Sequence, residues 1–365
     1  MGSIRIRLAE ESDNNQITDL AKRCYQEGMI TFFVNRTPRF NTLHRLLDPE
    51  SWHYVVEDGD TIVGLVGVIH FEAMLMGKPK KFAYMMDLRI DEEYRKGLTA
   101  FRMVKKAIDH VLSSDTDFVI GNFLKANQNS LVFASGRAGI PEGLHLGDNR
   151  IFNLLPIRNL KTDSRFEISP LSMDDFPELE NVYLNYAKNF RFAPQITADT
   201  LRGYFEWLEN LSPEHFLVAR ENGHIRAVTA MWDEKLYKSY QVLKVTPTIR
   251  IVNGALKLLS PLFKVPQPVR LNEPLKQLSL VLYAHDNCPE ALQSLFRHVN
   301  NTQRGSDYTL ITLYACESDP VFDLMKSFTG VSVQTEMYLY AKDTSIYEEI
   351  RKDKRPDRLP LALKV

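Results

Sequence analysis

The stretch YMMDLRIDEEYRKGLTAFRMVKKAIDHV, residues 84–111, decides the fold of this chain. Residues 84–90 form a short apolar run, which predicts a strand. From residue 99 onward apolar side chains recur at helical spacing while basic ones face elsewhere, which predicts an amphipathic helix. The apolar face of that helix comprises Phe101, Val104, Ile108 and Val111. Residues 91–98 are therefore a turn that leads from a strand into a helix.

This turn carries Arg95, Lys96 and Gly97 at the entrance to the helix. The first backbone N–H groups of a helix have no partner within it, and the helix dipole adds partial positive charge at the same end. Both effects favour a phosphate group at this position. The stretch thus predicts a site for a phosphorylated ligand.

The same stretch resembles the acyl-CoA-binding segment of the GCN5-related N-acetyltransferase (GNAT) superfamily, in which a strand is followed by Gln/Arg-x-x-Gly-x-Gly/Ala and a helix. Arg95 fits the first position of that pattern and Ala100 fits the last. Leu98 stands where the first Gly belongs, and Gly97 lies one place early. The departure matters because glycine lets the backbone approach a pyrophosphate closely. The run at 88–90 is similar to the family's Leu-x-Val, whose backbone lies along the pantetheine arm.

The resemblance implies acetyl-CoA, or another acyl-CoA, as the co-substrate, and no metal. The family often places an Asn before its last helix, where the side chain reaches the pantetheine arm. Asn127 and Asn129 both fit this description, and Asn127 is the better spaced. The expected cofactor-binding residues are Leu88, Arg89, Ile90, Arg95, Lys96, Gly97, Leu98, Thr99, Ala100 and Asn127.

Composition narrows the class of protein. The chain has 365 residues, 44% hydrophobic and 25% charged, as in a globular protein, and a formal net charge of −1 gives no global attraction to nucleic acid. Cys24, Cys288 and Cys316 are too few and too scattered for a disulfide framework or a metal site, which predicts a reducing, cytoplasmic environment. No apolar run is long enough to predict a membrane span, and the N-terminus has no secretory signal pattern.

The chain carries one order of elements twice: strand, two helices, hairpin, strand, helix, strand, helix. The hairpin segment HYVVEDGDTI at 53–62, for example, is matched by HFLVARENGHI at 215–225. Two fused copies of one fold explain the length better than two unrelated domains. The expected class is α/β (α+β), with two tandem GNAT-like domains, each a mixed, mostly antiparallel central sheet flanked by helices. The expected boundaries are an N-terminal domain at 1–156, a linker at 157–165, a degenerate C-terminal domain at 166–345 and a tail at 346–365.

The second copy departs from the phosphate pattern at its own helix entrance. There the sequence at 285–291 reads HDNCPEA. Asp286 and Glu290 would repel a pyrophosphate, so this copy is expected to complete the fold or to shape a pocket without binding CoA. Tandem GNAT proteins such as N-myristoyltransferases and mycothiol synthase resemble this layout in having one principal cofactor site.

A basic insert at 234–276 separates the hairpin of the second copy from its central strand. Within it, residues 249–263 have an apolar helical stripe. The favoured expectation is an amphipathic helix packed on the second domain. The alternatives are a basic lid over an anionic or lipid-like substrate and a helix in peripheral contact with a membrane surface.

The resemblance also implies catalytic groups. In the family an amine attacks the thioester directly, so a base must take the amine proton and an acid must protonate the leaving thiolate. The candidate bases are Asp87, Glu72 and the terminal carboxylate of Val365. Ser135 stands where the family has its acidic Tyr, on a short helix expected from about residue 130 to 137, and a serine is a poor acid.

Two functions follow from the resemblance. The first is an acyl-CoA-dependent N-acyltransferase, acetyl by expectation, that acts on an amine of a small molecule, amino acid or peptide. The alternative is a non-catalytic degenerate GNAT pair that binds acyl-CoA or a metabolite. Arg95, Ala100 and the repeat favour the enzyme, whereas Leu98 and Ser135 favour the binding protein. The sequence carries no signal for the acceptor or for an oligomeric state.

Overall fold

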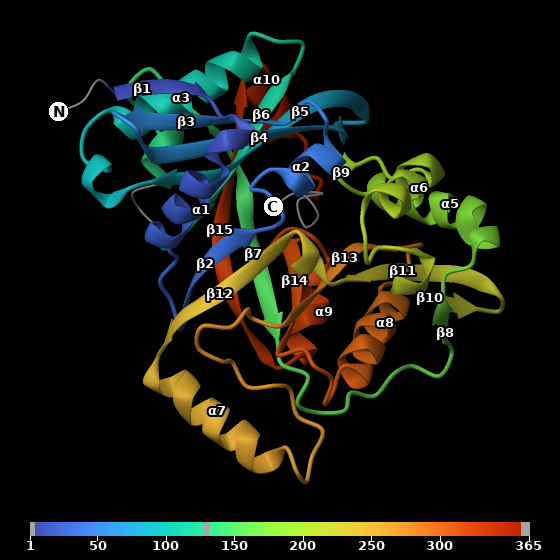
Figure 1. The fold of residues 1–365 in the computed structure, drawn as a ribbon. Helices are drawn as coiled ribbons and strands as arrows, with labels where there is room; N and C mark the ends of the chain where they lie inside the picture. Colours follow the sequence, from blue (N-terminus) through green and yellow to red (C-terminus); the bar gives the residue numbers. More distant parts are fainter. Residues whose placement is uncertain (1–3, 128–130, 359–365) are drawn as a thin grey trace.

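A computed structural model describes residues 4–127 and 131–358 of the chain (Figure 1). In these residues a single sheet of 13 strands runs through the molecule in the order β1-β3-β4-β5-β6-β15-β7-β14-β13-β11-β10-β8, with β9 added beside β4. A separate two-stranded ribbon pairs β2 with β12. Helices cover the faces of the sheet, which gives the α/β class that the sequence predicts.

The elements of the first half follow the predicted order, with β2 added between the two helices and β7 added at the end. They are β1 (Ile4–Leu8), α1 (Asn14–Arg23), β2 (Ile30–Arg36), α2 (Thr42–Leu47), β3 (Trp52–Asp58), β4 (Thr61–Leu75), β5 (Lys78–Ile90), α3 (Thr99–Leu112), β6 (Phe118–Leu124) and β7 (Leu144–Leu154). The short helix expected at about 130–137 falls partly outside the described residues, and its described part contains a 3-10 turn at Val132–Ala134.

The second half repeats that order with an insert. Its elements are β8 (Glu167–Pro170), α5 (Phe176–Ala187), β9 (Phe192–Pro194), α6 (Ala198–Trp207), β10 (Phe216–Glu221), β11 (His224–Trp232), β12 (Lys238–Val245), α7 (Pro247–Leu259), β13 (Gln277–His285), α8 (Pro289–Thr302), β14 (Leu310–Cys316), α9 (Val321–Leu324), β15 (Gly330–Ala341) and α10 (Ile346–Lys352).

A shared irregularity shows that the two halves are copies of one fold. In β5, Asp87 has a φ of 52° and shares with Leu88 a bulge opposite β4, where the register shifts between Leu65 and Gly67. In β13, Leu282 has the same φ of 52°, and the register with β11 shifts at the equivalent point. A side chain rarely adopts this left-handed conformation, so its recurrence at matching positions is not a chance feature of strands.

The halves exchange their last strands. β7, from the first half, pairs with β14 of the second, and β15, from the second half, pairs with β6 of the first. β15 and β7 also pair with each other, which makes the sheet continuous. The boundaries predicted at residues 156 and 166 therefore separate the two halves along the sequence only. In space, β7 pairs with the second half and β15 pairs with the first.

Two further pairings cross between the halves. β12, from the insert at 234–276, forms the antiparallel ribbon with β2, and β9 pairs with the far end of β4. The insert is thus partly a strand that covers the first half, a role that its basic composition did not predict. These contacts fix the second half against the face of the first that carries α1 and α2 (Figure 1).

The opposite face of the first half is covered by α3. Its buried residues Met103, Val104, Ala107, Ile108 and Val111 are at most 2% exposed and pack in one cluster with β3, β4 and β5. Fully burying side chains of this kind contributes about 1.5–3 kcal/mol each. The packing fixes the start of α3 beside the end of β5, where the predicted phosphate turn lies.

The apolar stripe of α7 is exposed, although the sequence predicted that it would pack on the second domain. The helix lies apart from the body of the molecule (Figure 1), and Leu256 is its only buried residue. Ile251 is 74% exposed and Leu258 78%. The apolar stripe is present as predicted, but the expectation that it packs on the second domain was wrong.

No helix within the described residues is long and apolar enough to cross a membrane.

Candidate functional site

The turn before α3 leaves backbone donors open. Leu98 is the N-cap of the helix and has no side-chain group to accept a hydrogen bond. The Arg102 N–H donates to the Leu98 carbonyl at 2.9 Å, so the amides of residues 99–101 precede the first hydrogen bond of the helix. This is the arrangement that an anion binds at a helix N-terminus.

Backbone geometry explains why a leucine stands in the glycine position of the pattern. Gly97 has a φ of +103° and open space around its missing side chain, so the left-handed residue of this turn lies one place early. Leu98 has a φ of −100°, which any residue adopts, and its side chain is 54% exposed. The turn therefore has the glycine that its backbone needs, one residue before the position that the family pattern gives it.

The basic side chains of the turn are exposed around these amides. Arg95 and Lys96 both face solvent, and Arg95 Nε donates to the carbonyl of Ile90 at 3.2 Å. Thr99 is half-buried, and Ala100 is buried at the start of α3. Asn127 lies in the exposed loop after β6, and Asn129 falls outside the described residues.

β5 and β6 separate just beyond this point. Their parallel pairing runs from Phe82 opposite Phe118 to Met85 opposite Gly121 and then stops, although both strands continue. Among the described residues, 86–90 thus have β4 on one side and no paired strand on the other. The bulge at Asp87 and Leu88 lies in this open segment, so it offers backbone groups to a ligand inserted between the strands.

A buried ionic cluster lies on the sheet face opposite α3. Asp87 accepts two hydrogen bonds from Arg36, at 2.9 and 3.1 Å, and a longer one from Arg89 at 3.4 Å. The side chains of Asp87, Arg36 and Arg89 are 8%, 9% and 9% exposed. Arg36 comes from β2 and Arg89 from β5, so the ribbon with β12 closes over this cluster.

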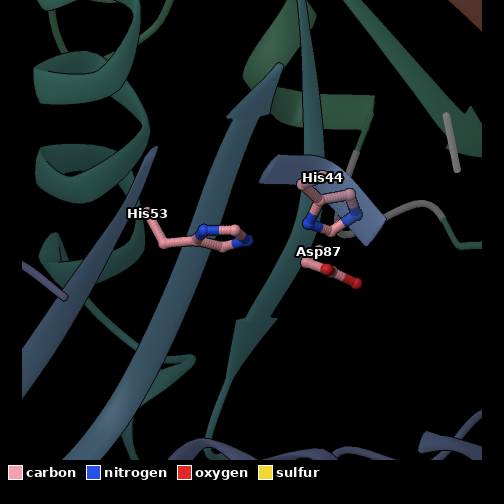
Figure 2. Close-up of side chains that lie close together, drawn as sticks. All are labelled: His44, His53 and Asp87. Atoms are coloured by element: carbon pink, nitrogen blue, oxygen red, sulfur yellow. The ribbon is translucent and has the colours of Figure 1, made fainter. Parts of the chain in front are cut away.

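Two histidines point into the same cluster. Figure 2 shows the imidazoles of His44, from α2, and His53, from β3, directed toward the carboxylate of Asp87. Gly67 makes room for one of them, because an added Cβ there would lie 2.5 Å from His53 Nε2. Burial, the main cause, lowers the pKa of His53 to about 4 and the pKa of His44 well below its usual value. Both rings are therefore neutral near pH 7.

Asp87 stays ionised in spite of its burial. The guanidinium groups of Arg36 and Arg89 outweigh the cost of desolvation and hold the pKa of Asp87 far below its usual range. A carboxylate held in this way is a weak base. Asp87 therefore acts as a fixed negative charge that holds Arg36 and Arg89 in place.

His44, His53 and Asp87 also have the composition of a metal site. Their potential ligand atoms lie within 4.8 Å of one another, and two imidazoles with a carboxylate suit zinc or iron. The charges argue against a cation, because Arg36 and Arg89 already bind this carboxylate. Two unit charges about 4 Å apart interact by about 4 kcal/mol at an effective dielectric constant of 20, and a divalent ion doubles that repulsion. The donor set fits a metal, but the electrostatics do not.

The other predicted catalytic residues within the described chain, Glu72 and Ser135, form no hydrogen bond or ion pair with this cluster. Glu72 is exposed and pairs across β4 and β5 with Lys81, whereas the bulge at Asp87 lies beside Gly67. Five residues along a strand separate Glu72 from Gly67, which is roughly 17 Å. Ser135 is exposed, and its hydroxyl donates to the carbonyl of Val132 at 2.7 Å. The structure does not bring these residues together with Asp87, and Val365 lies outside the described residues.

The equivalent opening in the second half is filled by side chains. β13 and β14 also stop pairing early, after Leu280 opposite Leu313. There the Tyr183 hydroxyl donates to the carbonyl of Leu282 at 2.5 Å, and Arg358 donates to the carbonyl of Tyr283. The Arg358 guanidinium lies over the rings of Tyr186 and Tyr283, at 4.6 and 4.7 Å from their centres. The bulge that is open in β5 is therefore capped in β13.

The helix entrance of the second half also differs. α8 begins at Pro289, which has no N–H, and the Cys288 N–H donates to His285 Nδ1 at 3.1 Å. Asp286 forms an ion pair with Arg226 at 3.0 Å, and Glu290 is exposed in the first turn. One donor is missing and another is occupied, so this entrance offers fewer open amides than the turn before α3.

Sequence reasoning missed most of the residues around Asp87. Arg36, His44 and His53 are scattered over three elements, and none belongs to the recognised pattern. A usable signal was present for His53, since it stands beside the apolar run Tyr54-Val55-Val56, and a histidine is costly to bury without a partner. Nothing in the sequence indicated Arg358, which contacts β13 from the end of the described chain.

Comparisons with known proteins agree with the predicted family. Residues 5–122 match the family model of the acetyltransferase (GNAT) domain. An N-myristoyltransferase from Saccharomyces cerevisiae, solved with bound myristoyl-CoA, superposes with a TM-score of 0.61 and 14% identity, covering 93% of this chain and 78% of that one. A GCN5-related N-acetyltransferase from Anabaena variabilis superposes with a TM-score of 0.53 and 11% identity, covering 94% and 74%. Identities this low show a common fold alone, and no curated protein matches the sequence.

Proposed function

Since this chain is a GNAT-superfamily protein with the family domain at residues 5–122, we propose that it is an acyl-CoA-dependent N-acyltransferase. The proposed donor is acetyl-CoA, and the proposed acceptor is an amine of a small molecule, amino acid or peptide. The observation that carries this proposal is the open bulge of β5 beside an uncapped helix entrance, against a capped bulge and an acidic entrance in the second half.

The donor binds in the first half. The diphosphate of CoA lies on the amides of residues 99–101 and beside Arg95 and Lys96. Its pantetheine arm enters between β5 and β6 and runs along Leu88, Arg89 and Ile90, with Asn127 near the mouth of the opening. The thioester then reaches the bulge, where a backbone N–H of residues 87–89 stabilises the oxyanion that forms in the transition state.

The acceptor approaches from the opposite face of the sheet. Asp87 supplies a fixed negative charge that attracts the acceptor ammonium. Because burial lowers the pKa of His44 and His53, we assign to water both protons that the nitrogen loses, one before it attacks as the neutral amine and one as the amide forms. The amine nitrogen forms a bond to the acyl carbon as the bond from that carbon to sulfur breaks. We assign the proton on the departing thiolate to water, because Ser135 is exposed and already donates to the carbonyl of Val132.

Release of free thiol from acetyl-CoA, measured across a panel of amines, tests the proposal. We expect amine-dependent thiol release that is abolished in Arg95→Glu/Lys96→Glu, with Glu290→Gln at the second entrance as the matched control. Longer acyl-CoA donors assayed in parallel decide the acyl preference. Tight CoA binding without thiol release from any donor and amine would identify the non-catalytic binding protein instead.

A further inference from the structure

Four buried polar atoms around Asp87 have no hydrogen-bond partner among the described residues. They are Arg36 Nη1, His44 Nδ1, His44 Nε2 and His53 Nε2. His44 is 0% exposed and His53 is 4% exposed, so bulk water does not satisfy them. Buried polar groups in native proteins nearly always have a partner, and four unpaired atoms in one cluster indicate a site for a polar ligand.

The charge of the cluster determines which ligand it favours. Arg36 and Arg89 carry two positive charges against the single negative charge of Asp87, and both imidazoles are neutral near pH 7. The neighbouring Lys238 is paired with Glu234 at 2.8 Å and adds no net charge. The surplus positive charge and the unpaired Nη1 of Arg36 both suit a carboxylate.

We propose that this cluster binds the carboxylate of an α-amino acid, which makes free amino acids the acceptors of the reaction proposed above. Arg36 Nη1 and an N–H of His44 or His53 donate to the carboxylate oxygens. The α-ammonium group, one carbon away, faces Asp87 and the bulge of β5. The role of the amino acid as an acceptor rests on the proposed function, whereas binding of its carboxylate to the cluster does not.

Matched pairs of amino acids and their amides test the inference on the unmodified protein. Each pair, such as glycine and glycinamide, keeps the amine and removes only the carboxylate charge. We expect kcat/KM to be on the order of 10- to 150-fold higher for the free acid, the range for hydrogen bonds to a charged group. Arg36→Lys should remove most of that preference while keeping the positive charge beside Asp87, and its thermal midpoint serves as the folding control. Equal kcat/KM for acid and amide would overturn the inference.

A binding arm separates the inference from the proposed function. Protein saturated with CoA, which has no acyl group to transfer, is titrated with glycine while the imidazole resonances of His44 and His53 are followed. Shifts of these resonances by glycine, with none by glycinamide, support the carboxylate site even if no amine releases thiol. Shifts with Zn²⁺ alone, or with neither compound, would overturn it. Turnover of amides alone would leave the acyltransferase standing and remove the amino-acid acceptor.

α7 carries a second inference from an independent observation. In and just after this helix, Ile251, Leu258, Leu262 and Phe263 are 74%, 78%, 78% and 59% exposed. The segment 247–264 also contains Arg250, Lys257 and Lys264, and no Asp or Glu. An exposed apolar stripe flanked only by positive charge matches an anionic lipid surface, where the apolar side chains insert and the basic ones contact headgroups.

We infer that α7 docks the protein on anionic membranes. Flotation with vesicles of phosphatidylcholine containing 30% phosphatidylserine tests this surface. We expect the protein to float with these vesicles, to remain behind with pure phosphatidylcholine, and to lose flotation in Leu258→Glu/Leu262→Glu. Met173→Glu is the matched control, since Met173 is 56% exposed elsewhere on the second half. Equal flotation of the double variant, or a stable dimer of the wild type that the double variant abolishes, would overturn the inference.

Discussion

Replacing Asp87 with Asn should destabilise the protein strongly, whatever its effect on activity. The substitution keeps the size of the side chain and removes the negative charge that neutralises Arg36 and Arg89, whose side chains are each 9% exposed. Breaking a buried pair by removing one partner costs about 3–5 kcal/mol, because the remaining charge stays buried without compensation. Here two guanidinium groups are left without their partner, so we expect a destabilisation near the upper end of that range.

Urea unfolding followed by circular dichroism measures this destabilisation. We expect a lower unfolding midpoint in Asp87→Asn and partial recovery when Arg36→Met removes one of the two surplus charges. Arg7→Met, combined with Asp87→Asn, is the control for this recovery. Arg7 pairs with Asp13 at 2.7 Å on the edge of the sheet and is 20% exposed, so its removal should not restore the midpoint. A midpoint for Asp87→Asn equal to that of the wild type would refute the reasoning, and a destabilisation that Arg36→Met deepens would show that the charges do not interact as the structure indicates.

Three further predictions concern the turn, the second half and the buried histidines. Arg95→Glu/Lys96→Glu should weaken CoA binding by about 1.5–3 kcal/mol for each charge-assisted hydrogen bond that the substitutions remove, measured by calorimetry at low salt, and unchanged affinity would contradict the site. Arg358→Ala should lower stability by about 1–3 kcal/mol, because it removes a buried donor to Tyr283 and a cation over two rings; an unchanged urea midpoint would argue against its capping role. The pKa of His53 is about 4 in the folded protein and about 6.5 in the unfolded chain, so between these pH values only the unfolded chain is protonated. The contribution of His53 to the free energy of unfolding is therefore complete above pH 6.5 and falls by about 1.4 kcal/mol per pH unit between 6.5 and 4. His53→Gln should reduce that slope in unfolding curves at pH 5 and 7, and an identical slope would contradict the buried, neutral ring.

Local patterns in the sequence predicted the elements well, because they depend on short-range periodicity. The helix expected from residue 99 onward spans Thr99–Leu112 in the structure, and the helix expected within 249–263 appears at Pro247–Leu259. The repeat predicted two copies of one fold, and the matching bulges at Asp87 and Leu282 agree with it. The turn before α3 was also located from its Arg, Lys and Gly.

Contacts between distant segments could not be predicted in the same way. Amphipathicity identifies the apolar face of α7 but not what covers it, and the structure leaves that face exposed. The exchange of β7 and β15 requires each strand to leave its own half, which no local pattern encodes. The cluster around Asp87 joins residues 36, 44 and 53 through the folding of three elements, so its members had no common signal.

The central claim is that one acyl-CoA binds per chain, in the first half. Calorimetric titration of the wild-type protein with CoA tests it most directly, with Arg95→Glu/Lys96→Glu and Glu290→Gln titrated alongside. The open bulge and uncapped helix of the first half, against the capped bulge and Pro289 of the second, predict a stoichiometry near one, with binding abolished in the first variant and kept in the second. Two equivalent sites, or a single site whose affinity is unchanged in Arg95→Glu/Lys96→Glu, would contradict the account.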